Sequence, residues 1–258
     1  MPLVFISHGS PVVAIEQDDY TKALRRMGED LPLPRAITIL SAHWEAPAPI
    51  RVTGSEQPAQ IYDFYGFPEE LYRLKYSSPG QPDLAREIVQ LLTAAGFAAQ
   101  LDPTRGLDHG AWVPMILAYP DAKVPVIELT LPVPRSASEL LKIGQTLAPL
   151  RERGVLLVGS GGVVHNLQRM HWGDKRASVD PWAHQFDKWV RSRLDKLDIQ
   201  GLADYEATAP GSKLAVPTTE HFDPIFLVLG AASERDRVTD IYEGMDYGNL
   251  SMRTFALR

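Results

Sequence analysis

A chain of 258 residues with a formal net charge of −6 and no cysteine excludes several classes of protein before any motif is considered. The negative charge and the lack of a long Lys/Arg block argue against nucleic acid and anionic membrane surfaces as partners. No apolar run approaches the roughly 20 residues that span a bilayer, and the N-terminal residues lack a signal-peptide pattern. We therefore expect a cytoplasmic protein with no membrane contact, in which imidazole and oxygen ligands would hold any metal.

Apolar runs alternate with amphipathic segments along the chain. In chain order, the expected elements are the strand Leu3–Ser7, the helix Tyr20–Gly28, the strand Ala36–Ala42, the helix Pro82–Ala95, the strand Val124–Leu131, the helix Ser138–Leu150, the strand Val155–Gly159 and the helix Pro181–Lys196. Ser138 and Asp180 stand where N-caps are expected. In the last third, we expect a buried helix after Asp223 and a terminal strand within residues 250–257.

This alternation predicts the fold class. Strands that alternate with helices form βα units, and such units build a mainly parallel sheet flanked by helices. The sequence contains no internal repeat, low-complexity tract or obvious linker. We therefore predict a single α/β domain over residues 1–258.

Three histidines stand at the ends of expected strands. His8 follows the first strand, His43 follows the second, and His165 follows the fourth after a glycine-rich turn. Each alone could be a surface turn or a satisfied core residue. Because ligands of open parallel sheets bind beyond the carboxyl ends of the strands, we expect the three imidazoles to share one site.

Four further histidines fall in two kinds of context. His109 in "LDHGAW" and His221 in "TEHFD" lie in turn-rich, partly apolar segments. His171 lies in a loop or helix end and His184 lies within an amphipathic helix, so we assign both to structural roles.

Several imidazoles without thiolates suit Zn, Fe, Cu or Ni. Three protein ligands with open coordination positions are typical of catalytic metal centres, and neighbouring histidines could move protons near neutral pH. The sequence therefore predicts a mononuclear metal site with histidine acid/base partners.

Five motifs carry a resemblance to a known family. "FISHGSP", "SAHWE", "LDHGAWVPM", "GSGGVVHNL" and "EHFDP", in this order, resemble the DODA-type (4,5-DOPA) extradiol dioxygenases of the class III extradiol superfamily. The resemblance spans nearly the whole chain. It implies the α/β fold of that superfamily and a non-haem Fe(II) centre that opens a catechol ring with O2. Bacterial relatives often contain zinc.

The same resemblance assigns roles to the histidines. It implies that His8, His43 and His221 bind one metal ion per chain, Fe(II) or Zn(II). His165 would be a further ligand or lie just outside the ligand set, and His109 would be an acid/base or substrate-binding group. The protocatechuate enzymes of the superfamily use two histidines and a glutamate, whereas an all-histidine set resembles catalytic zinc sites as much as iron sites.

Aromatic residues supply candidate walls for a catechol pocket. Residues 62–72 contain Tyr62 within a dense aromatic cluster. Trp44 follows His43 directly, and Trp112 lies close to His109 in the sequence. We expect Tyr62, Trp44 and Trp112 to bind substrate, although core packing explains the two tryptophans nearly as well. Glu45 either reaches the metal or orients a ligand, or it is an exposed carboxylate, which is the expectation we favour.

Other functions are compatible with parts of the pattern. The glycines of "LVGSGGVVHN" lack the spacing of a phosphate-binding loop, and "ISHGSP" is not a serine-hydrolase motif. A zinc-dependent hydrolase and a non-catalytic binding relative remain alternatives to the dioxygenase.

Overall fold

The computed structural model describes residues 1–258, and its centre is an eight-stranded sheet with the order β4-β3-β5-β2-β6-β1-β10-β7. Four strands form the parallel middle of the sheet: β5 (Val126–Pro132), β2 (Ala36–Ala46), β6 (Val155–Gly161) and β1 (Leu3–Ser7). All residues of β1 and β6 are buried, as expected for parallel strands that are covered on both faces.

The edges of the sheet are mixed. On one side, β3 (Ile50–Thr53) pairs antiparallel with β5 and parallel with β4 (Ala99–Asp102). On the other, β10 (Thr254–Leu257) pairs antiparallel with both β1 and β7 (Val238–Tyr242). The short strands β8 (Met245–Asp246) and β9 (Leu250–Ser251) form a separate ribbon.

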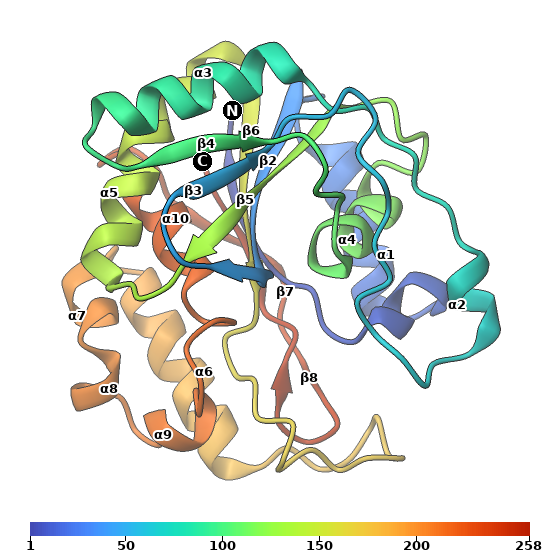
Figure 1. Ribbon diagram of the computed structural model, residues 1–258. Helices are drawn as coiled ribbons and strands as arrows, with labels where there is room; N and C mark the ends of the chain where they lie inside the picture. The colour runs from blue at the N-terminus through green and yellow to red at the C-terminus, as the bar shows by residue number, and fades with distance from the viewer.

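Helices cover both faces of the sheet (Figure 1). One face carries α3 (Pro82–Ala94), α5 (Ala137–Leu147), α10 (Pro224–Gly230) and α6 (Pro181–Leu194), and the other carries α1 (Asp19–Asp30) and α4 (His109–Ala118). In β1, Leu3 and Phe5 belong to the first core, while Val4 and Ile6 belong to the second. This alternation is the period of a strand buried on both sides.

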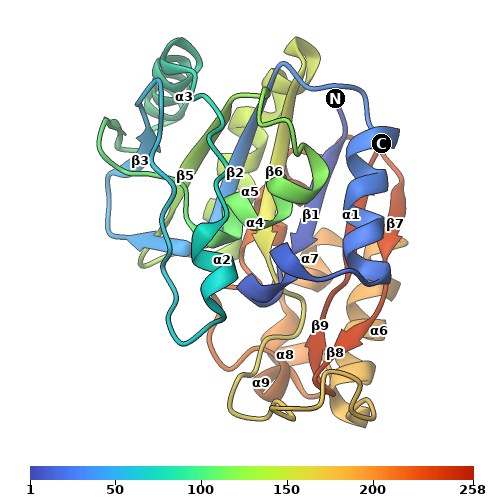
Figure 2. The same ribbon diagram turned by 90° about the vertical axis from the view of Figure 1, so that its right-hand side faces the viewer.

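Shorter elements complete the chain. These are the 3-10 turns Pro11–Ile15 and Ala148–Arg153 and the helices α2 (Glu69–Arg73), α7 (Ile199–Ala203), α8 (Tyr205–Thr208) and α9 (Ser212–Ala215). The two termini lie at the same end of the sheet (Figure 2), where Leu3 pairs with Leu257. None of the helices has the length and apolar character that a membrane crossing requires.

The predicted α/β class and the mainly parallel sheet are confirmed, and four local predictions need correction. The second strand runs to Ala46, so His43 lies inside it and not after it. The N-cap of α5 is Ser136 and not Ser138, because the Ser136 hydroxyl accepts a hydrogen bond from the Glu139 amide. Asp180 occupies the N-cap position of α6, but its carboxylate lies near His171 and does not cap the helix.

The last correction concerns the C-terminal strand, which is split into β9 and β10. Arg253 lies between the two pieces, fully buried, and its guanidinium donates three hydrogen bonds to Asp187 of α6. A buried guanidinium needs such partners, and Arg253 makes these bonds at the point where the strand is interrupted.

Candidate functional site

Five histidines from five segments converge beyond the carboxyl ends of the parallel strands. His8 follows β1, His43 lies near the end of β2, His109 begins α4, His165 follows β6, and His221 precedes α10. The ring centroids of His8, His43 and His221 lie 4.8, 4.9 and 5.3 Å apart. His109 lies 3.9 Å from His43, and His165 stacks on His221 at 3.5 Å.

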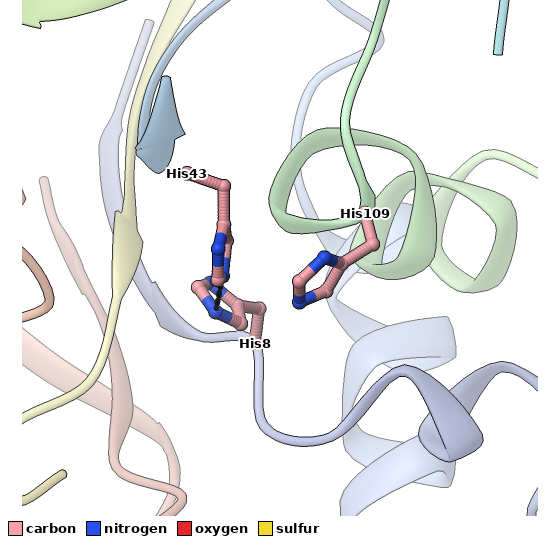
Figure 3. A group of neighbouring side chains, drawn as sticks. All are labelled: His8, His43 and His109. Atoms are coloured by element: carbon pink, nitrogen blue, oxygen red, sulfur yellow. Dashed lines mark hydrogen bonds between the residues drawn. The ribbon is translucent and has the colours of Figure 1, made fainter. Parts of the chain in front are cut away.

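A bulge in β2 carries His43 into this group. The register with β5 shifts between Leu40, which pairs with Leu129, and Glu45, which pairs with Leu131. Residues 41–44 of β2 therefore lie opposite residue 130 alone. Bulges redirect side chains at sheet edges and near active sites. Here the bulge turns the His43 ring toward His8 and His109 (Figure 3).

The hydrogen bonds of His8 fix which of its nitrogens is free. The Ser160 hydroxyl donates its only hydrogen to the Gly110 carbonyl at 2.5 Å, so it accepts a bond from the His8 Nδ1–H at 2.9 Å. The lone pair of His8 is therefore on Nε2, which lies 2.9 Å from Nε2 of His43. Two metal–nitrogen bonds of about 2.1 Å meeting near a right angle span about 3 Å, so this separation suits neighbouring ligands of one ion.

His221 supplies an orphaned nitrogen. Its Nδ1 lies 3.0 Å from the Glu220 carboxylate, which accepts the ring proton. Its Nε2 is buried and has no hydrogen-bond partner. Leaving such an atom unpaired costs about 1–3 kcal/mol, and a metal ion bound to its lone pair removes that cost. The donor set therefore fits a metal.

His109 is held by Asp63. The two carboxylate oxygens of Asp63 accept bonds from the His109 backbone N–H and from its Nδ1, both at 2.9 Å. A carboxylate on one ring nitrogen orients the other, an arrangement found both behind metal ligands and behind general bases. The ring points toward His8 and His43 (Figure 3).

The geometry gathers ligand atoms into two sets. Those of His8, His43 and His109 lie within 4.8 Å of one another, and so do those of His165, Glu220 and His221. The pair His8–His43 is common to the first set and to the ligand set that the sequence predicts. Proximity alone would make His109 the third ligand. The sequence motif and the unpartnered Nε2 favour His221 instead.

Burial keeps these imidazoles neutral. Burial, followed by the neighbouring imidazoles, lowers the pKa of His8 and of His221 well below the ordinary value. Burial also lowers the pKa of His43 and of His165 to about 4. Neutral rings present lone pairs at pH 7, which a metal centre requires.

The lowered pKa values predict that the metal-free protein loses stability on acidification. With a folded pKa of about 4 against an ordinary 6.5, His43 takes up its proton first in the unfolded chain. Its contribution is fully present above pH 6.5 and is lost as the pH falls toward 4. For His43 this amounts to about 2 kcal/mol between pH 7.5 and 5.

Urea unfolding of chelator-treated protein at pH 7.5, 6 and 5 measures this effect. His43→Leu should flatten the pH dependence, whereas His184→Leu on the exposed surface of α6 should leave it unchanged. An identical slope in wild type and His43→Leu would contradict the predicted neutral imidazole.

A cavity of about 190 Å³ opens onto the five rings. Its other walls are formed by Gly9, Ser10 and Pro11 and by the apolar side chains of Phe64, Phe67, Leu167, Met170, Trp172 and Leu250. Since a dry cavity of about 150 Å³ accommodates benzene, this space holds one six-membered ring and a short substituent.

Comparisons with known proteins show the family to which the chain belongs. Residues 2–253 match the family described as the catalytic LigB subunit of aromatic ring-opening dioxygenase. The chain belongs to the LigB family. It is 40% identical to a 4,5-DOPA dioxygenase extradiol from Beta vulgaris, over 97% of this chain and 94% of that protein. It is 39% identical to the protein of the same name from Escherichia coli (strain K12), over 98% and 93%.

A solved structure extends the similarity to the fold. The crystal structure of an uncharacterized protein from Escherichia coli K12 superimposes with a TM-score of 0.85 at 34% identity, and covers 100% of both chains. The predicted family is thus confirmed. This LigB-family chain shares its fold and its family with extradiol ring-cleaving dioxygenases.

Three predicted substrate contacts of this LigB-family protein do not line the cavity. Tyr62 turns its hydroxyl to the Leu74 carbonyl at 2.6 Å. Trp112 is fully buried and donates its indole N–H to the Ile61 carbonyl, and Trp44 is covered by the Arg105 guanidinium at 5.0 Å. They are held in other contacts, and their role in substrate binding stays a prediction.

The aromatic segment still contributes to the wall, through different residues. Phe64 lies between Trp112 and His109, with ring centroids at 6.2 and 5.8 Å, and Phe67 packs on Phe64. Both line the cavity. Spacing alone does not show which ring of an aromatic cluster faces inward.

The remaining histidines lie outside the group. His184 is exposed on α6, and His171 is exposed beside Asp180. The sequence-based reasoning did not identify Asp63 and Ser160, which orient His109 and His8. The only signal for either was its place in a motif, Asp63 in the aromatic cluster and Ser160 among the glycines.

Glycines let the segments of the site approach closely. A Cβ on Gly161 would lie 2.0 Å from the His221 carbonyl oxygen, which accepts a hydrogen bond from the Gly162 amide at 2.7 Å. The end of β6 can therefore lie directly against the His221 segment only with glycine at this position.

Glu45 does not reach the histidine group. Its carboxylate accepts a bond from Arg135 at 2.7 Å. The same guanidinium donates to Asp223 and, at 3.2 Å, to the hydroxyl of Thr219. Arg135 thereby links the strand that carries His43 to the segment that carries His221.

Proposed function

We propose that this protein is an extradiol dioxygenase that opens the ring of a catechol with O2 at a single metal ion held by His8, His43 and His221. The observation that carries the proposal is the unpartnered, buried Nε2 of His221 beside the 2.9 Å pair of Nε2 atoms from His8 and His43. The three imidazoles line a cavity with the size and apolar walls that an aromatic ring requires.

The metal is Fe(II) or Zn(II), one per chain, with His165 as a further ligand or directly outside the ligand set. Such an ion supplies Lewis acidity toward the two hydroxyl oxygens of a catechol and, in the case of iron, reactivity with O2. The carboxylate of Glu220 and the hydroxyl of Ser160 accept hydrogen bonds from the Nδ1–H groups of His221 and His8. These bonds fix the tautomers in which Nε2 carries the lone pair for the metal.

His109 is the group we assign to proton transfer. With its Nδ1–H on Asp63, its other nitrogen can accept the proton that a catechol hydroxyl gives up, and Asp63 stabilises the resulting imidazolium. His109 can return that proton to the ring-opened product. His165, stacked on His221, is the second acid/base candidate.

The apolar walls exclude water and hold the ring in one orientation, so that the reaction with O2 is effectively intramolecular. The carbon–carbon bond next to the diol, outside the two hydroxyls, is broken. Both oxygen atoms of O2 enter the product, a semialdehyde with the composition of catechol plus O2.

Anaerobic reconstitution tests this function. Metal-stripped protein is loaded with Fe(II) or with Zn(II), mixed with catechol and then exposed to O2. We expect the Fe(II) form to consume one O2 per catechol and to form a yellow ring-fission product. No O2 uptake by the Fe(II) form, together with ester or amide hydrolysis by the Zn(II) form, would favour a zinc hydrolase instead.

A further inference from the structure

The cavity has no Asp, Glu, Lys or Arg side chain in its lining, and the imidazoles are its only titratable groups. Besides the histidines, its walls include the six apolar side chains of Phe64, Phe67, Leu167, Met170, Trp172 and Leu250, and Ser10 contributes the only hydroxyl. No carboxylate, ammonium or guanidinium group lines it. A substituent on a bound ring therefore meets apolar surface.

The charged groups closest to the histidines lie behind them, and both are negative. Asp63 is bonded to His109, and Glu220 is bonded to His221. The cations of the neighbouring loop are not available in the cavity. Lys175 is held by Glu16, Asp18 and Asp246, and Arg169 is exposed and outside the lining.

The mouth of the cavity exposes apolar side chains to solvent. Trp172 is 67% exposed and Leu167 is 47% exposed, and the Trp172 indole N–H donates to the Leu167 carbonyl at 3.1 Å. Both side chains line the cavity. Large apolar side chains exposed side by side mark a binding surface, and a substituent that leaves the cavity would cover them.

Resting on the proposed function, we propose that the substrate is a catechol with an uncharged, apolar ring substituent, and that Leu167 and Trp172 select it. An amino-acid side chain such as that of DOPA, the compound named in the relatives from Beta vulgaris and Escherichia coli, carries a carboxylate. That carboxylate would meet apolar side chains in the cavity without gaining a cationic partner from the lining. Burying an unpaired charge in this way is unfavourable.

A panel of catechols tests the proposal in two readouts. The first is kcat/KM of the Fe(II) form, and the second is the Kd of the Zn(II)-loaded protein, measured anaerobically by equilibrium dialysis. We expect 4-methylcatechol to exceed DOPA about tenfold and 3,4-dihydroxyphenylacetate about a hundredfold in both readouts. Equal or better values for DOPA or the carboxylate compound would overturn the proposal.

Variants of the residues at the cavity mouth test whether these residues cause the preference for an apolar substituent. Trp172→Ala should reduce the advantage of 4-methylcatechol over unsubstituted catechol, and Leu167→Arg should raise the affinity for 3,4-dihydroxyphenylacetate about tenfold by supplying a cation. Tyr65→Ala, which removes a 93% exposed ring outside the cavity lining, is the matched control and should change neither ratio.

The two readouts separate failure of this inference from failure of the proposed function. Absence of ring cleavage for every catechol, with the expected order of Kd values intact, would count against the dioxygenase and support the apolar site. Cleavage of all the compounds with no order among them, or with charge preferred, would count against the apolar site alone.

Discussion

Replacing His8, His43 or His221 with alanine is expected to abolish metal binding, whereas His109→Ala should keep the metal and lose turnover. His8 and His43 present Nε2 atoms 2.9 Å apart, and the Nε2 of His221 is buried without another partner. Loss of one of three ligands should lower the metal content from about one ion per chain to a small fraction. Loss of the proton-transfer group should lower kcat by about 10²–10⁴ with the ion in place.

Metal analysis of dialysed variants, with O2 uptake on the Fe(II)-loaded samples, separates the two roles. His184→Ala is the matched control, because this histidine is exposed on α6 and outside the group. Stoichiometric metal in His221→Ala together with metal loss in His109→Ala would reverse the two assignments. That outcome would make the compact set His8, His43 and His109 the ligand set.

The sequence predicted the parallel centre of the sheet because its strands are buried on both faces. Leu3–Ser7 matches β1, and Val155–Gly159 lies within β6, since continuous apolar runs bounded by turns leave little ambiguity. By contrast, α4 was not predicted. Its residues are apolar on every side and include Pro114, so the segment shows no amphipathic period.

The candidate site was predictable in its imidazoles but not in their supports. His8 follows its strand directly and His165 follows one after a short glycine-rich turn, and parallel strands deliver such residues to one edge. The partner of a ring nitrogen depends on tertiary contacts between distant segments. Asp63 meets His109 across 46 residues, and Ser160 meets His8 across 152, so no local pattern reveals either pair.

The bulge in β2 is another feature that the local sequence does not predict. Residues 41–44 look like the end of a strand because Ser41 and His43 interrupt the apolar run. Pairing with β5 resumes at Glu45, whose carboxylate accepts a bond from Arg135. The contact that follows His43 in the strand thus joins distant segments, and the local sequence does not encode it.

That contact makes Arg135 a positioning residue, and Arg135→Ala is expected to weaken both the fold and the metal site. Thr219 and Asp223 flank His221, Glu45 lies two residues beyond His43, and one guanidinium binds all three side chains. Removing it leaves the Asp223 carboxylate, which is buried, without its cation. Breaking a buried ion pair from one side costs about 3–5 kcal/mol in the free energy of unfolding.

The metal readout distinguishes positioning from general stability. Arg135→Ala should lower metal affinity about 10–100-fold, as loss of a supporting contact does at other metal sites. Arg135→Lys keeps the charge without the planar fork and should recover part of that affinity. Arg151→Ala removes a comparable ion pair, to Asp236 at 2.7 Å, near Met1 at the opposite end of the sheet.

Because Arg151 touches no segment of the site, its alanine variant should lose stability but retain wild-type metal affinity. Urea unfolding and a competitive chelator titration on the same three variants provide both quantities. If Arg135→Ala and Arg151→Ala bind metal equally well, Arg135 contributes only to stability. If Arg135→Ala alone binds it poorly, the ion pairs around Glu45 and Asp223 hold His43 and His221 at the distance that one ion requires.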